Sequence, residues 1–325
     1  MGEVSPLSVT ASATDVVDAL CQLKLELSYN TGSPEQIAIT ADMVYVGTLA
    51  LGDNTVTINY GGKTATVTVT LVNNALTVSQ IKALPASTET HELTGVVMSS
   101  TFIADIVPNA TWSELLIREK GSNQVIGIRD AGVSGTSYLA GLEKGDEIII
   151  KVVLKVTSTN VNESEVGKIA PFKVANSNVV VLSKGNDVKL DVTQATTLAD
   201  FTEFTNWLKD ADTRNANRYK LAKIPAGTGF VNYSASNRSM YLAYNQESAA
   251  ATKVDGRYPY FIDMNYAPAH GSLDILQEFF GTSAINNSWT NKSILQRDAY
   301  VMYVGGQGIY YHHFIWLGSD YIAQA

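Results

Sequence analysis

The sequence predicts an all-β protein, and three observations lead to this class. Residues 54–72 alternate apolar and hydroxyl-bearing side chains about a Gly61-Gly62 pair, which is typical of a β-hairpin with one buried face. Further runs rich in Val and Ile follow in the middle of the chain. Two similar segments, beginning at Thr77 and Thr197, each place a short helix before a new series of strands. The 325 residues have room for two or three domains.

The hairpin has a predictable register. Two adjacent glycines suit the positive φ angles of a type I′ turn, which places the residues on either side of it opposite one another. The apolar pairs should face a core and the hydroxyl pairs should face water. The predicted pairs are Val56 with Val67, Ile58 with Ala65, Thr55 with Thr68, Thr57 with Thr66 and Asn59 with Thr64. Residues 23–29, LKLELSY, repeat the period of two and predict another strand of the same domain.

This N-terminal segment resembles a bacterial immunoglobulin-like domain, above all in its ending of strand, Gly-Gly, Lys-Thr-Ala and strand over residues 54–72. The resemblance covers about residues 7–72. Such domains are spacers and adhesive modules of proteins displayed outside bacterial cells, so the resemblance implies an extracytoplasmic setting and no catalysis. An exported protein needs a leader, and none precedes Gly2, so we expect a leader that has been removed.

Composition narrows the function classes further. No run approaches the roughly 20 apolar residues of a membrane-spanning helix, so no membrane span is expected in this chain. A formal charge of -8 argues against nucleic acid as a partner, since phosphate binding needs clustered Lys and Arg. Cys21 is the one cysteine, so it can form neither an internal disulfide nor a thiolate metal site, and we interpret it as a small hydrophobic residue.

The two predicted helices begin with the same pattern of residues. Thr77 and Thr197 are predicted N-caps, with Gln80 and Asp200 three residues later as partners in a capping box. Apolar residues then recur at helical spacing. They are Val78, Ile81 and Leu84 in the first helix and Leu198, Phe201 and Leu208 in the second, and the strands that follow begin near His91 and Arg218.

Three features follow the first helix in order: a strand containing TGVV, a hairpin ending in IRDA, and a strand that begins after GD. This order resembles that of OB-like β-barrel domains of Bacteroidetes surface proteins. The last part of the chain resembles a diverged copy, with a long insertion at about residues 249–297. The predicted fold is therefore an immunoglobulin-like β-sandwich (1–74), an OB-like β-barrel (75–190) and an aromatic-rich, diverged OB-like domain (191–325). Acidic loops in the first barrel, from Glu143 to Glu165, would repel phosphates and are interpreted as solubilising.

Aromatic residues concentrate near the C-terminus. Residues 201–325 hold 22 of the 29 aromatic residues, and their 10 basic and 10 acidic residues balance. Tyr and Trp combine an apolar ring with a polar tip, which suits sugars and protein surfaces, although core packing is the alternative. We therefore predict a binding site of solvent-facing rings in the last domain. The candidates are Tyr258, Tyr260, Tyr266, Tyr310 and Trp316.

Metal and catalytic sites find little support. His312 and His313 are neighbours on a predicted strand and point to opposite faces, so they cannot bind one metal together, and we predict no metal, no cofactor and one packed histidine. There is no GxSxG, HExxH, P-loop or dinucleotide motif. Paired carboxylates for glycoside hydrolysis, among Asp255, Asp263 and Asp274, stay open as an alternative.

Three functions are consistent with these patterns. We expect first a non-enzymatic cell-surface protein in which a stalk of β-domains presents a C-terminal module that binds a glycan or a protein. A purely structural component of a surface assembly is the second. A polysaccharide hydrolase is the third.

Overall fold

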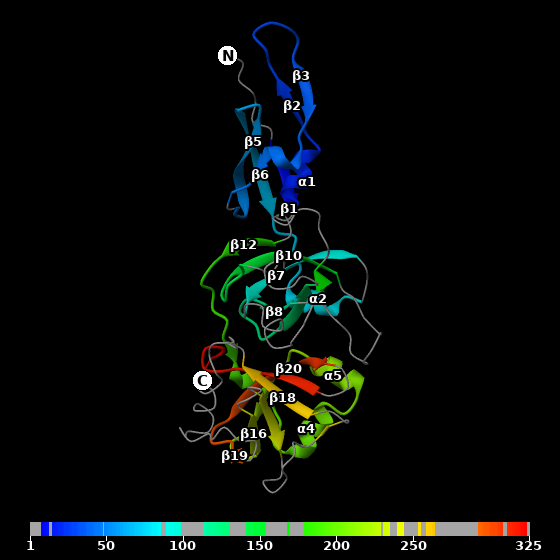
Figure 1. Ribbon diagram of the computed structural model, residues 1–325, viewed down its shortest axis with the longest axis vertical. Helices are drawn as coiled ribbons and strands as arrows, with labels where there is room; N and C mark the ends of the chain where they lie inside the picture. The colour runs from blue at the N-terminus through cyan, green and yellow to red at the C-terminus, as the bar shows by residue number, and fades with distance from the viewer. Residues whose placement is uncertain are drawn as a thin grey trace.

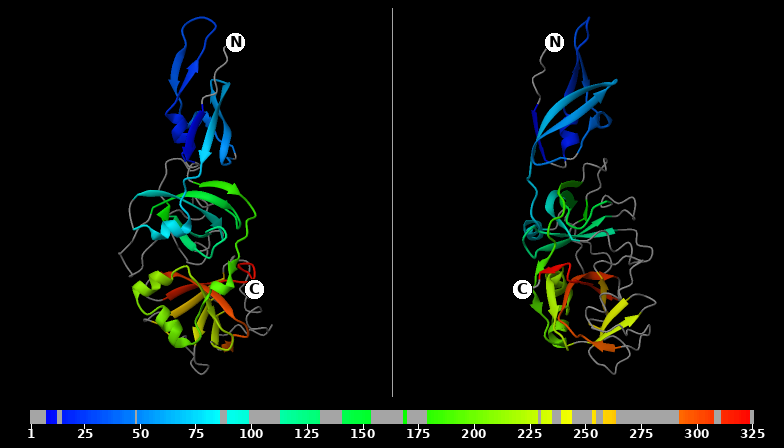
Figure 2. Two further views of the ribbon diagram at one scale, coloured as in Figure 1. Left: turned by 180° about the vertical axis from the view of Figure 1, so that it is seen from behind. Right: turned by 90° about the vertical axis from the view of Figure 1, so that its left-hand side faces the viewer.

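In the computed structural model the chain is built mainly of strands, which form three units that follow one another along the long axis of the molecule (Figures 1 and 2). The first unit holds β1 to β6, the middle unit β7 to β12 and the third unit β13 to β22. The structure describes residues 8–12, 15–47, 49–85, 89–98, 113–130, 141–153, 168–169, 179–228, 230–234, 239–243, 253–254, 258–263, 292–307 and 311–323. Among these residues no strand pairs with a strand of another unit.

The first unit packs two sheets against each other. One sheet has the order β1-β6-β5-β4 and the other is the antiparallel pair β2-β3. Apolar residues of both sheets and the buried residues Val16 and Leu20 of the first helix form one core. The elements are β1 (Ser8–Ser12), α1 (Val16–Cys21), β2 (Lys24–Leu27), β3 (Glu35–Ala38), η1 (Ala41–Met43), β4 (Val44–Tyr45), β5 (Gly52–Tyr60) and β6 (Lys63–Val72).

The β5–β6 hairpin confirms the predicted register. All five predicted pairs are present, and Tyr60 pairs with Lys63 next to the turn. Both turn glycines have positive φ, 53° at Gly61 and 77° at Gly62, as a type I′ turn requires. Val56, Ile58 and Val67 are buried. The alternation of Val and Thr therefore determines which face of this hairpin meets the core.

Replacing Gly62 by Val should destabilise the protein by about 1 kcal/mol or more, because a β-branched residue resists a φ of 77°. No atom lies within 4 Å of the position of the added Cβ, so the expected cost is one of backbone strain alone. Chemical denaturation would measure it. Gly62→Asn is the matched control, because Asn tolerates this conformation and should cost much less. Equal stability of the Val and Asn variants would contradict the proposed cause.

The middle unit begins with the predicted helix. In α2 (Val78–Ala83), the Thr77 side chain accepts from the Gln80 N–H and the Gln80 side chain accepts from the Thr77 N–H, which confirms the capping box. The sheet has the order β11-β9-β8-β7-β10-β12, and β11 also pairs with β10. Its strands are β7 (Thr90–Val97), β8 (Ser113–Arg118), β9 (Val125–Asp130), β10 (Glu147–Val153), β11 (Lys168–Ile169) and β12 (Val179–Ser183).

The third unit is an eight-stranded sheet in the order β14-β15-β20-β21-β18-β17-β16-β19, with a separate pair of β13 and β22. Its elements are β13 (Leu190–Asp191), η3 (Val192–Gln194), β14 (Thr196–Thr197), α4 (Phe201–Trp207), α5 (Ala211–Asn217), β15 (Leu221–Ile224), β16 (Phe230–Ser234), β17 (Ser239–Ala243), β18 (Tyr258–Asp263), β19 (Lys292–Ile294), β20 (Ala299–Gln307), β21 (Tyr311–Trp316) and β22 (Ile322–Ala323).

Two predictions for the third unit were wrong. The N-cap of α4 is Asp200, which accepts from the Glu203 N–H at 2.9 Å, whereas Thr197 lies in β14. Asp caps a helix as well as Thr does, so the pattern alone left the start ambiguous by one turn. The predicted insertion at 249–297 contains β18, which pairs with both β17 and β21 inside the sheet. This strand is therefore integral to the unit and not an appended segment.

Strands of the middle and third units are buried on both faces. In β8, Leu115 and Ile117 belong to the core inside the middle unit, whereas Leu116 between them belongs to a second apolar cluster that also contains residues of the third unit. In β21, Phe314 and Trp316 face the inner core of the third unit and Ile315 faces the same shared cluster. Successive residues of a strand point to opposite faces, so one strand contributes to two cores.

Candidate functional site

The described aromatic side chains of the third unit pack either in its inner core or in the apolar cluster that it shares with the middle unit. Of nine that are described, seven are buried and the other two, Phe201 and Tyr300, are half-buried. Phe314 lies at the centre, with its ring centroid 5.5 Å from that of Phe204, 6.3 Å from that of Trp207 and 5.4 Å from that of Tyr303. Packing in apolar clusters therefore accounts for the aromatic side chains that the structure describes in this unit.

The predicted binding rings are not brought together by the described structure. Trp316 is only 2% exposed and packs in the inner core of the third unit, so its prediction as a solvent-facing ring was wrong. Tyr258 and Tyr260 lie on β18, where their backbones pair with Tyr311 and His313. Their side chains, and the whole of Tyr266 and Tyr310, lie outside what the structure describes, so these four stay predictions.

The two histidines do lie on one strand, β21. His312 is fully buried, and its Nε2 lies 2.9 Å from the carbonyl oxygen of Val254. The His313 side chain falls outside the described residues, as do Asp255 and Asp274. Within the described part of the chain, no group of three or more His, Cys, Asp or Glu side chains is placed to hold a metal ion.

Cys21 is free and half-buried at the end of α1. Burial, together with the nearby carboxylates of Asp18 and Asp42, raises the pKa of its thiol. A raised pKa keeps the thiol protonated at neutral pH, which makes it a poor nucleophile. This environment is consistent with the interpretation of Cys21 as a small hydrophobic residue.

Large apolar side chains are exposed in the first unit. Tyr29, Tyr45 and Tyr60 are 54%, 68% and 40% exposed, and Leu51 is also exposed; every exposed large hydrophobic residue within the described ranges belongs to this unit. Tyr29 follows β2, and Tyr60 is the last residue of β5 before the Gly61-Gly62 turn. The connection from β2 to β3 and the turn from β5 to β6, next to which these residues lie in sequence, are at the end of the first unit farthest from the middle unit (Figure 1).

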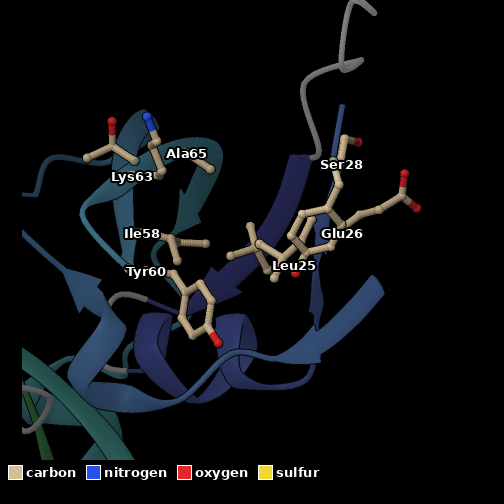
Figure 3. Close-up of a pocket in the computed structure, with 11 residues that line it drawn as sticks. Leu25, Glu26, Ser28, Ile58, Tyr60, Lys63 and Ala65 are labelled. Carbon is tan, nitrogen blue, oxygen red and sulfur yellow. The ribbon is translucent and has the colours of Figure 1, made fainter. Parts of the chain in front are cut away.

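A groove of about 430 Å³ separates β2 from the tip of the β5–β6 hairpin (Figure 3). We call it the end groove. The apolar side chains of Leu25, Ile58 and Ala65 line it, and Tyr60 extends into the space between the two strand pairs. Its size is within the range of small-molecule sites, which combine an apolar lining with a few polar groups. The end groove is therefore the candidate functional site of the described structure.

Polar groups lie around the end groove. The Tyr29 hydroxyl donates to Glu35 Oε2 at 3.0 Å, and this hydrogen bond raises the pKa of the phenol, so Tyr29 stays neutral at physiological pH. Lys63 lines the groove on the hairpin side, whereas the Glu26 carboxylate points away from the groove, on the far side of β2 (Figure 3). Within the described chain, neither of these two charged side chains forms a salt bridge. Of the two, the Lys63 ammonium group is the one that a ligand in the groove could meet.

Sequence reasoning missed this site because it counted aromatic residues and did not weigh where each one lies. A usable signal was present. Tyr60 and Lys63 flank a tight turn, where side chains reach water easily, and Tyr29 follows β2, a strand of a sheet of only two strands. Two strands cannot cover the whole inner face of a longer hairpin, which leaves the groove open.

Comparisons with known proteins identify no family. No family model matches the chain, and no curated protein matches it. A solved structure, "Crystal structure of a putative aspartyl-tRNA synthetase from Leishmania major Friedlin", matches over 36% of this chain and 22% of that protein, with 10% identity and a TM-score of 0.24. A match this weak and partial carries no argument about fold or function. No helix in the described ranges is long and apolar enough to cross a membrane.

Proposed function

We propose that the chain is a non-enzymatic module of a bacterial cell-surface protein, in which three β-rich units form one stiff stalk that presents a binding surface. The observation that carries the proposal is that apolar clusters cross both joins between the units. Domains joined only by a linker move relative to one another, whereas a buried apolar interface holds them in one arrangement. The extracytoplasmic setting rests on the sequence resemblances alone.

The first join is apolar with one ion pair. Ile149 of β10 and Val180 of β12 belong to the same cluster as Val69 and Leu71 of the first unit. Lys151, on the same strand as Ile149, pairs with Asp15 just before α1. Because the Lys151 side chain is largely buried, this pair restricts orientation more than an exposed pair would.

The second join has a larger apolar cluster. Met98, Leu116 and Val125 of the middle unit share it with residues of the third unit. The third-unit members are Val188, Leu190, Tyr219, Leu221, Met302, Val304, Ile315, Leu317, Tyr321 and Ile322.

Polar contacts fix the second join further. The Asn123 side chain donates to the Asp191 carbonyl at 2.7 Å and accepts from the Asp191 N–H at 2.8 Å. Lys144 lies 4.8 Å from the ring centroid of Tyr321 and 3.5 Å from a carboxylate oxygen of Asp320. These two hydrogen bonds to the Asp191 backbone resemble the bonds that a neighbouring strand would make. The segment that connects the middle and third units is therefore held in place and is not a free linker.

Two acidic residues of the middle unit, Asp146 and Glu147, have structural partners, which adds to their predicted role in solubility. Asp146 is buried and accepts from the Glu143 N–H at 2.9 Å. Glu147 accepts hydrogen bonds from Lys120 and Ser183, both at 2.8 Å. These two carboxylates therefore fix the loop before β10 and the first residue of β10 in place.

The strand order supports an OB-like assignment of the middle and third units. In the middle unit, β8-β9-β11-β10 pair in succession with β9 and β11 parallel. The third unit repeats this order as β17-β18-β21-β20 with β18 and β21 parallel. An OB-fold is a partly open Greek-key barrel of five strands, and a shared order is expected of two copies of one fold. The two packed sheets of the first unit support the immunoglobulin-like assignment in the same way.

Small-angle X-ray scattering tests the stalk. We expect the intact chain to scatter as one elongated body with a narrow distribution of sizes. Ile149→Asp should broaden that distribution, because a carboxylate in the first join must reach water and will separate the two surfaces. Thr55→Asp, at an exposed position of the first unit, is the matched control and should change nothing. A wild-type distribution as broad as that of Ile149→Asp would contradict the proposal.

A further inference from the structure

The turn between α5 and β15 lies at the second join. The Lys220 N–H donates to the Asn217 carbonyl oxygen at 3.2 Å, which closes a turn of four residues after α5. Tyr219, inside this turn, belongs to the apolar cluster that the third unit shares with Met98 and Leu116 of the middle unit. Figure 1 shows α5 on the side of the third unit that faces the middle unit.

The backbone of Tyr219 is strained. Arg218 has a φ of -61° and a ψ of 133°, and Tyr219 has a φ of 62°. These are the angles of a type II turn, whose third residue needs a positive φ and is normally Gly or Asn. Within the described residues, Tyr219 is the one non-glycine residue with a positive φ. A bulky side chain is disfavoured there, because its Cβ approaches the carbonyl oxygen that follows.

Contacts of two kinds hold Tyr219 in this conformation. Its N–H donates to the Tyr303 carbonyl oxygen at 2.8 Å, and the guanidinium group of Arg218 lies 5.0 Å from the centroid of its ring. Both contacts are within the third unit. The ring is also only 4% exposed in the shared cluster, and this burial depends in part on the middle unit.

Lys220, the last residue of the turn, lies within electrostatic reach of the middle unit. Partial burial of its ammonium group, and then the nearby charge of Lys220, lower the pKa of Lys82 in α2. Two like charges repel, so Lys220 does not favour the joined state. The favourable contribution of this turn to the second join is therefore the apolar ring of Tyr219.

We propose that Tyr219 is a strained latch of the second join, because its ring stabilises the joined state while its backbone destabilises the third unit by itself. In the joined chain, burial of the ring outweighs the strain of one residue. When the join opens, the middle-unit side of the cluster is lost and the strain remains. Replacing Tyr219 should therefore have effects of opposite sign in the joined and the separated chain. The latch rests on the second join of the proposed stalk.

Tyr219→Gly tests the latch in two chains, the wild type and Leu116→Asp, in which a carboxylate should open the second join. Thermal unfolding of the third unit is followed by tryptophan fluorescence. In the wild-type chain the loss of the ring should lower the midpoint by about 5 °C or more. In the Leu116→Asp chain the relief of strain should raise the midpoint by about 3 °C. Tyr219→Asn, which also accepts a positive φ, should show the same reversal.

Tyr321→Gly is the matched control. Tyr321 is 2% exposed in the same cluster, and its φ is not positive, so glycine removes a ring there and relieves no strain. This variant should lower the midpoint in both chains.

Three results would overturn the latch. The first is that Tyr219→Gly lowers the midpoint, or leaves it unchanged, in the Leu116→Asp chain, which would make Tyr219 an ordinary core residue of its own unit. The second is that Tyr219→Gly raises the midpoint in the wild-type chain. The third is that Tyr321→Gly shows the same reversal. If Leu116→Asp unfolds in a single transition, the stalk and the latch both fail, whereas loss of the reversal with separate transitions contradicts the latch alone.

Discussion

Replacing Phe314 by Ala should lower the free energy of unfolding by about 3–5 kcal/mol, the range found when a large buried ring is truncated. Phe314 is fully buried and its ring contacts those of Phe204, Trp207 and Tyr303, so the cavity would have rigid aromatic walls that relax poorly. Denaturant titration followed by tryptophan fluorescence would measure the loss, because Trp207 belongs to the same cluster.

Phe201→Ala provides the comparison for this prediction. Phe201 packs against the same cluster but is only partly buried, so its truncation should cost clearly less. A loss below about 1 kcal/mol for Phe314→Ala would show that the rings do not form the rigid core described, since a loss that small is typical of surface positions.

Leu116→Asp should uncouple the third unit from the rest of the chain. Leu116 is fully buried in the cluster of the second join, while its neighbours Leu115 and Ile117 face the inner core of the middle unit and remain in place. A buried, unpaired carboxylate costs several kcal/mol, which the join can relieve by opening. Calorimetry should then resolve the single transition expected of the wild type into at least two.

The control for uncoupling is again Thr55→Asp, which adds the same charge at an exposed position of the first unit. This variant should still unfold in a single calorimetric transition. A single, merely shifted transition for Leu116→Asp would mean that the second join does not couple the units.

The first unit was the most predictable part of the fold. Its hairpin alternates Val and Thr, because one face meets a core and the other meets water, and a Gly-Gly turn allows only one natural register. The capping box at Thr77 was equally predictable, since all its partners lie within four residues. These two features could be predicted because the residues that determine them are close together in the sequence.

The joins and the end groove were not predicted, because they depend on contacts distant in sequence. The continuous apolar runs Leu115–Ile117 and Ile148–Ile150 were predicted to be strands, and they lie in β8 and β10. The runs lack the alternation of the first unit because both faces are buried, one in a core and one in a join. In the same way, the count of C-terminal aromatics could not separate a core ring such as Trp316 from an exposed one such as Tyr60.

The most direct test of the central claim, that three units form one stiff stalk, is ¹⁵N relaxation of backbone amides in strands of all three units. A body that tumbles as a whole has a single anisotropic diffusion tensor. The account predicts that amides of β5 and β6, of β8 and β10, and of β20 and β21 all fit that one tensor. If each unit instead required its own, shorter correlation time, the units would move independently and the claim would be contradicted.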